Sequence, residues 1–205
     1  PVGRAAFDKL VAGADVFITN MPIPTRERLN IGYEAIRVIN ERIVYASISA
    51  YGEKGPEAGR PGFDSTALWA RTGLMDLVKP GPNSPPARSL PGMGDHPTAM
   101  SLFAAIMTGL FRRERTGEGS HVSTSLMANG VWWNGLLTQA MLCGGKVVCR
   151  PPREDAGNPM HNLYQTRDGR WIHIIFNTNL HRWPEFAALI DRPELGDDPR
   201  FESQS

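Results

Sequence analysis

The chain has 205 residues, of which 41% are hydrophobic and 21% charged, with a formal net charge of +1. This composition is typical of a soluble globular protein, and the charge excludes a global field that would favour nucleic acid or an anionic membrane. The two cysteines, Cys143 and Cys149, fit neither a zinc knuckle nor a redox pair, so a reducing, cytoplasmic setting is expected.

The first quarter of the chain predicts a parallel βαβ unit. Residues 14–20 form a short apolar run that suits a buried strand, and Pro22 and Pro24 force a loop before a short helix. Residues 33–39 place their apolar side chains on one helical face, and residues 43–49 form a second apolar run. Strand, helix and strand at this spacing predict a parallel sheet with a right-handed crossover.

The middle of the chain alternates connections with helices. In chain order we expect a loop over 52–62, a helix over 64–72, a long connection over 79–91, a long helix over 98–115, a strand over 121–126 and a second long helix over 127–143. A boundary follows around 150–162, where two prolines and several charges break the pattern. Beyond it, an Asp-Gly turn joins two strands into a hairpin, and a helix over 181–190 follows.

Asp95 stands in the sequence Leu-Pro-Gly-Met-Gly-Asp-His-Pro-Thr, just before the helix expected from Thr98. The simplest interpretation is an N-cap, because Asp is preferred at that position. A carboxylate that follows two glycines and precedes a helix N-terminus can also be approached closely by a ligand, and we expect Gly92 and Gly94 to leave that room.

Several common kinds of site are missing from the sequence. The five histidines form no zinc-helix pair, so no metal site is predicted, and there is no nucleophile elbow or Walker loop. The glycines of 52–62 lack the dinucleotide-binding spacing. These absences weigh against most hydrolases, kinases and metalloenzymes.

The chain resembles the family III CoA transferases (the CaiB/BaiF type), which include formyl-CoA transferase, carnitine CoA-transferase and the α-methylacyl-CoA racemases. The resemblance follows family order along nearly the whole chain. Its segments are ADVFITN at 14–20, ERLNIGYE at 27–34, IVYASISAYG at 43–52, RPGFD at 60–64, GD at 94–95 and RTGEGSHV at 115–122.

The resemblance implies an α/β fold, with a Rossmann-like CoA-binding domain over 1–143, a linker over 144–152 and a small α+β domain over 153–205. A complete family member is longer, so an N-terminal βα segment and a C-terminal return are expected outside this chain. The family forms an interlinked homodimer. Coenzyme A enters as a substrate rather than a resident cofactor, with an acyl-CoA and a small carboxylic acid as the partners.

Asp95 falls on the nucleophilic aspartate of the family. In the transferase scheme its carboxylate attacks an acyl-CoA thioester to give an aspartyl–acyl anhydride and CoA thiolate. The thiolate then attacks the aspartyl carbonyl, which leaves an aspartyl–CoA thioester and releases the first acid, and an acceptor carboxylate reverses the sequence. Backbone N–H groups at the helix start are expected to orient the carboxylate and to stabilise oxyanions.

By the same resemblance, Asn20, Met21 and Arg28 would lie against CoA, with Arg28 able to pair with a phosphate. Arg60 is a further candidate for a phosphate contact. Their plainer interpretations are a polar strand end, a loop residue, a helix-surface cation and a solvated loop arginine. The family pattern Asn-Phe-Arg-Pro-Gly is Asn-Met-Pro-Ile-Pro at residues 20–24, so the local CoA contact is expected to differ.

Phe63 separates two activities within this superfamily. The racemases use a histidine in a Gly-His-Asp segment to exchange the α-proton, and here the segment is Gly62-Phe63-Asp64. Phe63 cannot transfer a proton, which favours CoA transfer, and Asp64 is expected to cap the next helix. An epimerase with an unrecognised base and a CoA-binding protein without turnover are the alternatives.

Overall fold

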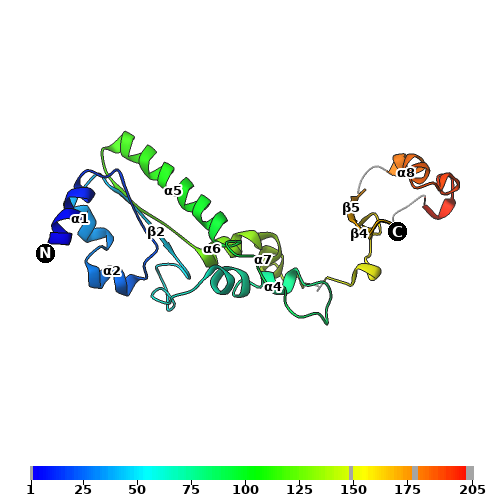
Figure 1. Ribbon diagram of the computed structural model, residues 1–205, viewed down its shortest axis with the longest axis horizontal. Helices are drawn as coiled ribbons and strands as arrows, with labels where there is room; N and C mark the ends of the chain where they lie inside the picture. Colours follow the sequence, from blue (N-terminus) through cyan, green and yellow to red (C-terminus); the bar gives the residue numbers. More distant parts are fainter. Residues whose placement is uncertain (1, 148–149, 177–179, 202–205) are drawn as a thin grey trace. The chain divides into compact units, whose positions relative to one another are not determined.

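A computed structural model of the chain describes residues 2–147, 150–176 and 180–201 (Figure 1). The chain divides into two compact units: Pro1–Lys79 with Pro85–Val148, and Pro80–Ser84 with Cys149–Ser205. None of the helices in the described residues has the length and apolar character that crossing a membrane requires.

The first unit is built on a parallel sheet, as the sequence predicts. Its strands are β1 (Val16–Thr19), β2 (Val44–Ser49) and β3 (Ser120–Ser125), in that spatial order, with Val16 opposite Val44 and Val44 opposite Ser120. Around the sheet lie α1 (Val2–Ala12), α2 (Ile23–Leu29), α3 (Tyr33–Ile39), the π-helix η1 (Asp64–Ala70), α4 (Leu74–Leu77), α5 (Asp95–Thr116), α6 (Leu126–Trp133) and α7 (Gly135–Leu142).

Helices cover both faces of this sheet because successive side chains of β2 point to opposite sides. Tyr45 packs with Val11 of α1 and Ile36 of α3 on one face. Ala46 packs with Leu102 and Ile106 of α5 on the other. Figure 1 shows the long α5 running beside the strands. A further cluster joins η1, α4 and α6, and Met93 packs against it.

The start of α5 differs from the prediction, since the helix begins at Asp95 rather than near Thr98. Pro97 is accommodated because the N–H groups of a first turn have no acceptor within the helix. For the same reason Pro24 lies in the first turn of α2, where a loop was expected. The predicted glycine stop of α5 is confirmed, with Gly117 at the C-cap and φ 78°.

The helix predicted over 127–143 is interrupted at Asn134, which separates α6 from α7. The buried Asn134 side chain donates a 2.6 Å hydrogen bond to the carbonyl of Thr72, and Gly135 follows it. This bond ties the break to the segment after η1. The periodicity of the sequence does not show it, because Thr72 is distant along the chain.

One side of α5 is apolar and exposed. Leu102 and Ile106 face the sheet, whereas Met100, Phe103, Met107 and Phe111 are at least half exposed. Exposed apolar stretches of this kind mark contact surfaces in proteins.

The second unit contains the predicted hairpin of β4 (His161–Gln165) and β5 (Trp171–Ile175), which pair antiparallel around Asp168 and Gly169. The helix predicted over 181–190 is α8 (Trp183–Leu189). Trp183 anchors it, since its indole donates to the carbonyl of Leu195 at 2.6 Å and its ring packs on Phe201. Short 3₁₀ turns complete the unit: η2 (Arg153–Asp155), η3 (Leu180–Arg182), η4 (Pro193–Leu195) and η5 (Pro199–Phe201).

Candidate active site

Asp95 is the first residue of α5 and lies toward the carboxyl edge of the parallel sheet. The direction of α5 is shown by its C-terminal end, which lies near the start of β2: Arg42, just before β2, donates a 2.9 Å hydrogen bond to the carbonyl of the C-cap residue Gly117. The N-terminal end of α5 therefore lies toward the end of β2. Ligands of open α/β sheets bind at the carboxyl edge. The position of Asp95 is therefore one at which a ligand is expected.

The Asp95 side chain does not cap its own helix. The N-cap is Gly94, whose missing side chain supplies no capping bond, and Asp95 is exposed. Among the described residues the Asp95 carboxylate has no hydrogen bond or ion pair. The simplest sequence interpretation, that Asp95 is an N-cap, is therefore wrong, because Gly94 occupies the N-cap position and Asp95 is the first residue within the helix.

Asp64 is an acidic residue whose negative charge acts on the Asp95 carboxylate. It is the first residue of η1, and one of its oxygens accepts a 2.6 Å hydrogen bond from the N–H of Ser65. Its other oxygen accepts a 3.5 Å bond from the N–H of Gly94. The expectation that Asp64 caps η1 is wrong by one position, since Phe63 is the N-cap, and the Asp64 carboxylate faces the start of α5.

Gly94 is required by packing within the protein. A Cβ there would lie 2.8 Å from the Cβ of Asp64, which is too close, and 3.2 Å from that of Leu68, which is a tight contact. Gly92 has φ 75°, and a Cβ on it would lie 3.0 Å from Nε2 of His96. At Gly94 the room expected for a thioester is therefore taken by side chains of the protein, whereas at Gly92 the neighbour is the exposed ring of His96.

The environment of Asp95 makes its carboxylate more basic. Partial burial, followed by the negative charge of Asp64, raises the pKa of Asp95, and His96 opposes the rise. A more basic carboxylate is the better nucleophile once it is ionised.

The first turn of α5 offers few free donors to an oxyanion. The N–H of His96 donates to Gly92 and that of Thr98 to Gly94, at 3.0 and 3.3 Å. Pro97 has no N–H. Within the described residues only the N–H of Asp95 itself remains without an acceptor in this turn, so the expected cluster of backbone donors is reduced to one.

A cleft of about 290 Å³ opens beside Asp64. Its lining combines apolar and polar side chains: Asp64, Ser65, Trp69, Met75, Arg88, Ser89, Leu90 and Pro91. The indole of Trp69 donates a 2.7 Å hydrogen bond to the carbonyl of Ala87, and the N–H of Ala87 donates to Met75 at 2.8 Å. These bonds fix the backbone next to Arg88, an exposed cation with no ion-pair partner among the described residues.

Asn20 and Met21 directly follow β1 and are exposed. The N–H of Met21 donates a 3.2 Å hydrogen bond to Oγ1 of Thr19, and its carbonyl accepts a 2.5 Å bond from Nε of Arg26. Both backbone groups of Met21 are thus held by neighbouring side chains, which leaves its side chain at the surface.

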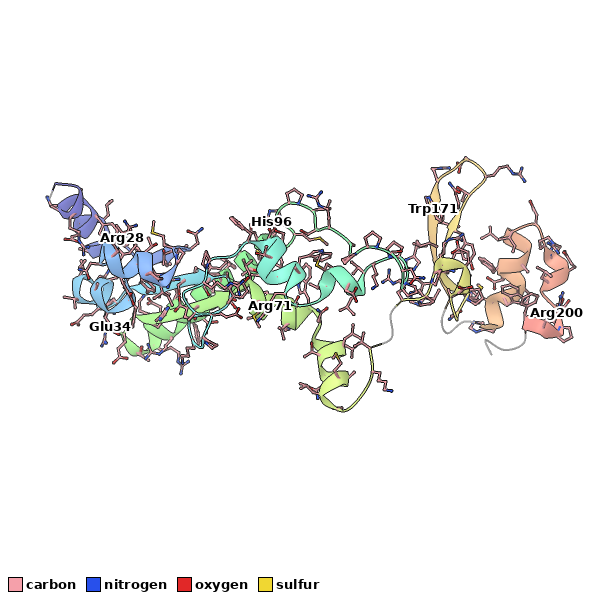
Figure 2. All side chains as sticks on the ribbon, turned by 90° about the horizontal axis from the view of Figure 1, so that it is seen from below. Arg28, Glu34, Arg71, His96, Trp171 and Arg200 are labelled. Atoms are coloured by element: carbon pink, nitrogen blue, oxygen red, sulfur yellow. The ribbon has the colours of Figure 1, made fainter. Side chains whose placement is uncertain are left out.

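The other two predicted CoA contacts lie on separate segments. Arg28 is exposed on α2 and has no ion pair among the described residues. Arg60 lies in the loop after β2, pairs with Glu57 at 2.6 Å and covers the ring of Tyr51. Figure 2 shows Arg28 separated along the unit from His96, the neighbour of Asp95, so only an extended ligand could reach both.

Sequence reasoning missed a buried polar network behind Met21. Arg26, on α2, is 5% exposed and forms an ion pair with Glu53. The second oxygen of Glu53 lies 3.2 Å from Nε2 of His121, which in turn lies 2.9 Å from Oγ of Ser47. Arg26 stands in the run Arg-Glu-Arg, which indicates a solvated helix face, so nothing local distinguishes it.

A larger cavity of about 500 Å³ lies at the opposite edge of the sheet, where β2 and β3 begin. Arg37, Arg42, Arg112 and Glu118 are among its lining residues. It contains none of the predicted site residues. Because ligands of such sheets bind at the carboxyl edge, the candidate site is the region of Asp95.

The described residues thus form an α/β unit with a parallel sheet, and an exposed carboxylate stands at the start of a helix near the carboxyl edge of that sheet. The chain belongs to CoA-transferase family III, whose model matches residues 1–205.

Named relatives share this assignment. The chain is 31% identical over 97% of its length to (R)-2-hydroxy-4-methylpentanoate CoA-transferase of Clostridioides difficile, and covers 49% of that protein. It is 32% identical to acetyl-CoA:oxalate CoA-transferase of Acetobacter aceti, again over 97% of its length and 50% of the relative. The chain therefore spans about half the length of the curated relatives it matches.

Solved structures agree with the fold. A CaiB/BaiF family protein from Brucella suis superposes with a TM-score of 0.84 and 28% identity, covering 100% of this chain and 53% of that one. Rv3272 from Mycobacterium tuberculosis gives a TM-score of 0.80 at 26% identity, covering 99% and 52%.

Proposed function

We propose that the full-length protein is an acyl-CoA:carboxylate CoA-transferase that forms an aspartyl–CoA thioester on Asp95. The observation that carries the proposal is the state of this side chain. In a member of CoA-transferase family III, Asp95 begins α5 with an exposed carboxylate that no described residue binds. A structural cap or ion pair would have occupied it.

In the proposed reaction the Asp95 carboxylate attacks the thioester carbonyl of an acyl-CoA, and the C–S bond breaks to release CoA thiolate. The thiolate attacks the aspartyl carbonyl of the anhydride, so the first acid leaves and CoA is held on Asp95. An acceptor carboxylate then attacks this thioester, and the same two steps run in reverse. No proton has to move in either half, which is consistent with a site that has Phe63 where a base would be needed.

Coenzyme A is proposed to extend from Asn20, Met21, Arg28 and Arg60 to Asp95 as a substrate. The cleft beside Asp64 is proposed to receive the acyl group. Its apolar part, formed by Trp69, Met75, Leu90 and Pro91, suits an apolar side chain, and Ser65 and Ser89 suit a hydroxyl.

Two relatives support acids of that kind. One is named for (R)-2-hydroxy-4-methylpentanoate and another for phenyllactate, both acids with an apolar side chain. We therefore propose small 2-hydroxy acids as acceptors, with Arg88 attracting the acceptor carboxylate.

A transfer assay of the full-length protein tests this function. Acyl-CoA donors are incubated with 2-hydroxy acids, oxalate or glutarate, and new CoA thioesters are measured for the unmodified protein and for D95N. Transfer that D95N abolishes supports the proposal. Exchange of the α-proton in deuterated water without an acceptor would support epimerisation instead, and CoA binding without either reaction would support a non-catalytic protein.

The interlinked homodimer and the cytoplasmic setting belong to the same proposal. The exposed apolar stripe of α5, formed by Met100, Phe103, Met107 and Phe111, supports a protein contact on that helix. Light scattering of the full-length protein gives its mass in solution, and a monomer would contradict the dimer.

A further inference from the structure

Arg26 connects two loops at the carboxyl edge of the sheet. Its Nε donates to the carbonyl of Met21, in the loop after β1, at 2.5 Å. Its Nη1 pairs with Glu53, in the loop after β2. A guanidinium can bind both because its donors form a rigid planar fork.

Glu53 is itself anchored to the sheet. His121 of β3 lies 3.2 Å from one Glu53 oxygen and 2.9 Å from the hydroxyl of Ser47 on β2. The His121 ring stacks on Tyr33 at 5.2 Å. Hydrogen bonding to His121 and to Arg26 lowers the pKa of Glu53 to about 2, so this carboxylate stays ionised at neutral pH. The charge that holds Arg26 is therefore permanent under ordinary conditions.

These contacts fix the backbone of Met21. Thr19 holds its N–H and Arg26 holds its carbonyl, while its side chain stays 41% exposed. A Cβ at Gly59 would lie 3.7 Å from the ring of Pro24, so the loop after β2 also approaches the first turn of α2. Nη2 of Arg26 is buried without a hydrogen-bond partner among the described residues.

We infer that Arg26 is a positioning residue for coenzyme A: by binding the Met21 carbonyl and Glu53 together, it fixes the loop after β1 in the shape that receives the ligand. The inference rests on the proposed function, because CoA is the ligand of that loop only if the protein handles CoA. Because Arg26 is only 5% exposed, we assign it a positioning role rather than a contact with the ligand.

The test uses full-length protein and coenzyme A in calorimetric titration, together with kcat and KM for acyl-CoA. R26K keeps the charge beside Glu53 but loses the fork that also reaches Met21. We expect CoA affinity to fall about tenfold, the loss typical of one charge-assisted hydrogen bond, with kcat at saturation little changed. R37K, the same change at an exposed arginine of α3, is the control and should bind CoA normally.

An R26K protein that folds and binds CoA as tightly as the unmodified protein would overturn the inference. Equal losses in R26K and R37K would also overturn it. If R26K does not fold, E53Q decides the question, since it removes the charge that holds Arg26 and keeps the shape, and unchanged affinity in E53Q would contradict the inference. Failure of the unmodified protein to bind CoA would instead refute the proposed function, and this inference with it.

Discussion

The Asp64 carboxylate accepts a hydrogen bond from the backbone N–H of Gly94, and this contact brings a second negative charge to the start of α5. Asp95 is the next residue, and its pKa is raised by partial burial and then by Asp64. The geometry thus places a basic, unpaired carboxylate beside a second carboxylate that is held by backbone N–H groups.

Removing the charge of Asp64 should move the pH profile of the reaction. In D64N the repulsion is gone, so Asp95 loses its proton at lower pH and the acid limb of kcat/KM shifts to lower pH. The measurement is kcat/KM for an acyl-CoA against pH. D15N, at an exposed carboxylate paired with Arg113 near the other end of α5, is the control and should leave the limb in place. A shift to higher pH in D64N would contradict the account.

Adding a methyl group at Gly94 should destabilise the first unit. In G94A the new Cβ meets Asp64 and Leu68, and relieving that overlap is expected to cost about 1–3 kcal/mol of unfolding free energy. Urea unfolding of the full-length protein measures the loss. G135A is the matched control, because nothing lies within 4 Å of a Cβ at the start of α7. Equal stability of the two variants would show that η1 and α5 do not pack as described.

Glu53 should make the protein sensitive to acid. Its pKa in the folded state, about 2, lies below the ordinary value of 4.5. Its contribution is therefore complete above pH 4.5 and is lost as the pH falls from 4.5 toward 2. The contribution is on the order of 3 kcal/mol, from 1.36 kcal/mol per pKa unit.

In E53Q the unfolding free energy should be lower at neutral pH and should fall less steeply between pH 4.5 and 2. Denaturant unfolding at several pH values checks this. E34Q, at an exposed pair on α3, is the control. An acid limb in E53Q as steep as that of the unmodified protein would argue against the buried network.

Replacing Arg88 should weaken binding of the acceptor acid and leave binding of CoA unchanged. If it attracts the acceptor carboxylate, R88Q should raise KM for a 2-hydroxy acid about tenfold, the loss expected for a charge-assisted contact, while the dissociation constant of CoA stays the same. Kinetics with varied acceptor and calorimetry with CoA separate the two effects. R37Q serves as the control. A loss of CoA affinity in R88Q would indicate that the cleft binds coenzyme A rather than the acceptor acid.

The sequence predicted those helices, strands and turns that are determined by residues close together along the chain. The parallel pairing of β1 with β2, the helix over 33–39 and the Asp-Gly hairpin follow from periodicity and turn chemistry, and the structure confirms them. The start of α5 was misplaced because Pro97 is a helix breaker in most positions but acceptable in a first turn.

The remaining features depend on contacts between distant residues. The break at Asn134 is tied to Thr72, and Gly94 is required by Asp64. The role of Arg26 could not be predicted from the sequence, because its partners Met21 and Glu53 come from different loops. Asp95 could be selected from the sequence through family resemblance, whereas its free carboxylate and the scarcity of backbone donors around it required the structure.

Mass spectrometry of the full-length protein decides whether Asp95 carries coenzyme A during turnover. The protein is incubated with an acyl-CoA without acceptor, quenched in acid and digested. We expect a CoA adduct on the peptide that contains Asp95, which is absent in D95N and is discharged when an acceptor acid is added before quenching. CoA transfer without an adduct on that peptide, or transfer that persists in D95N, would contradict it.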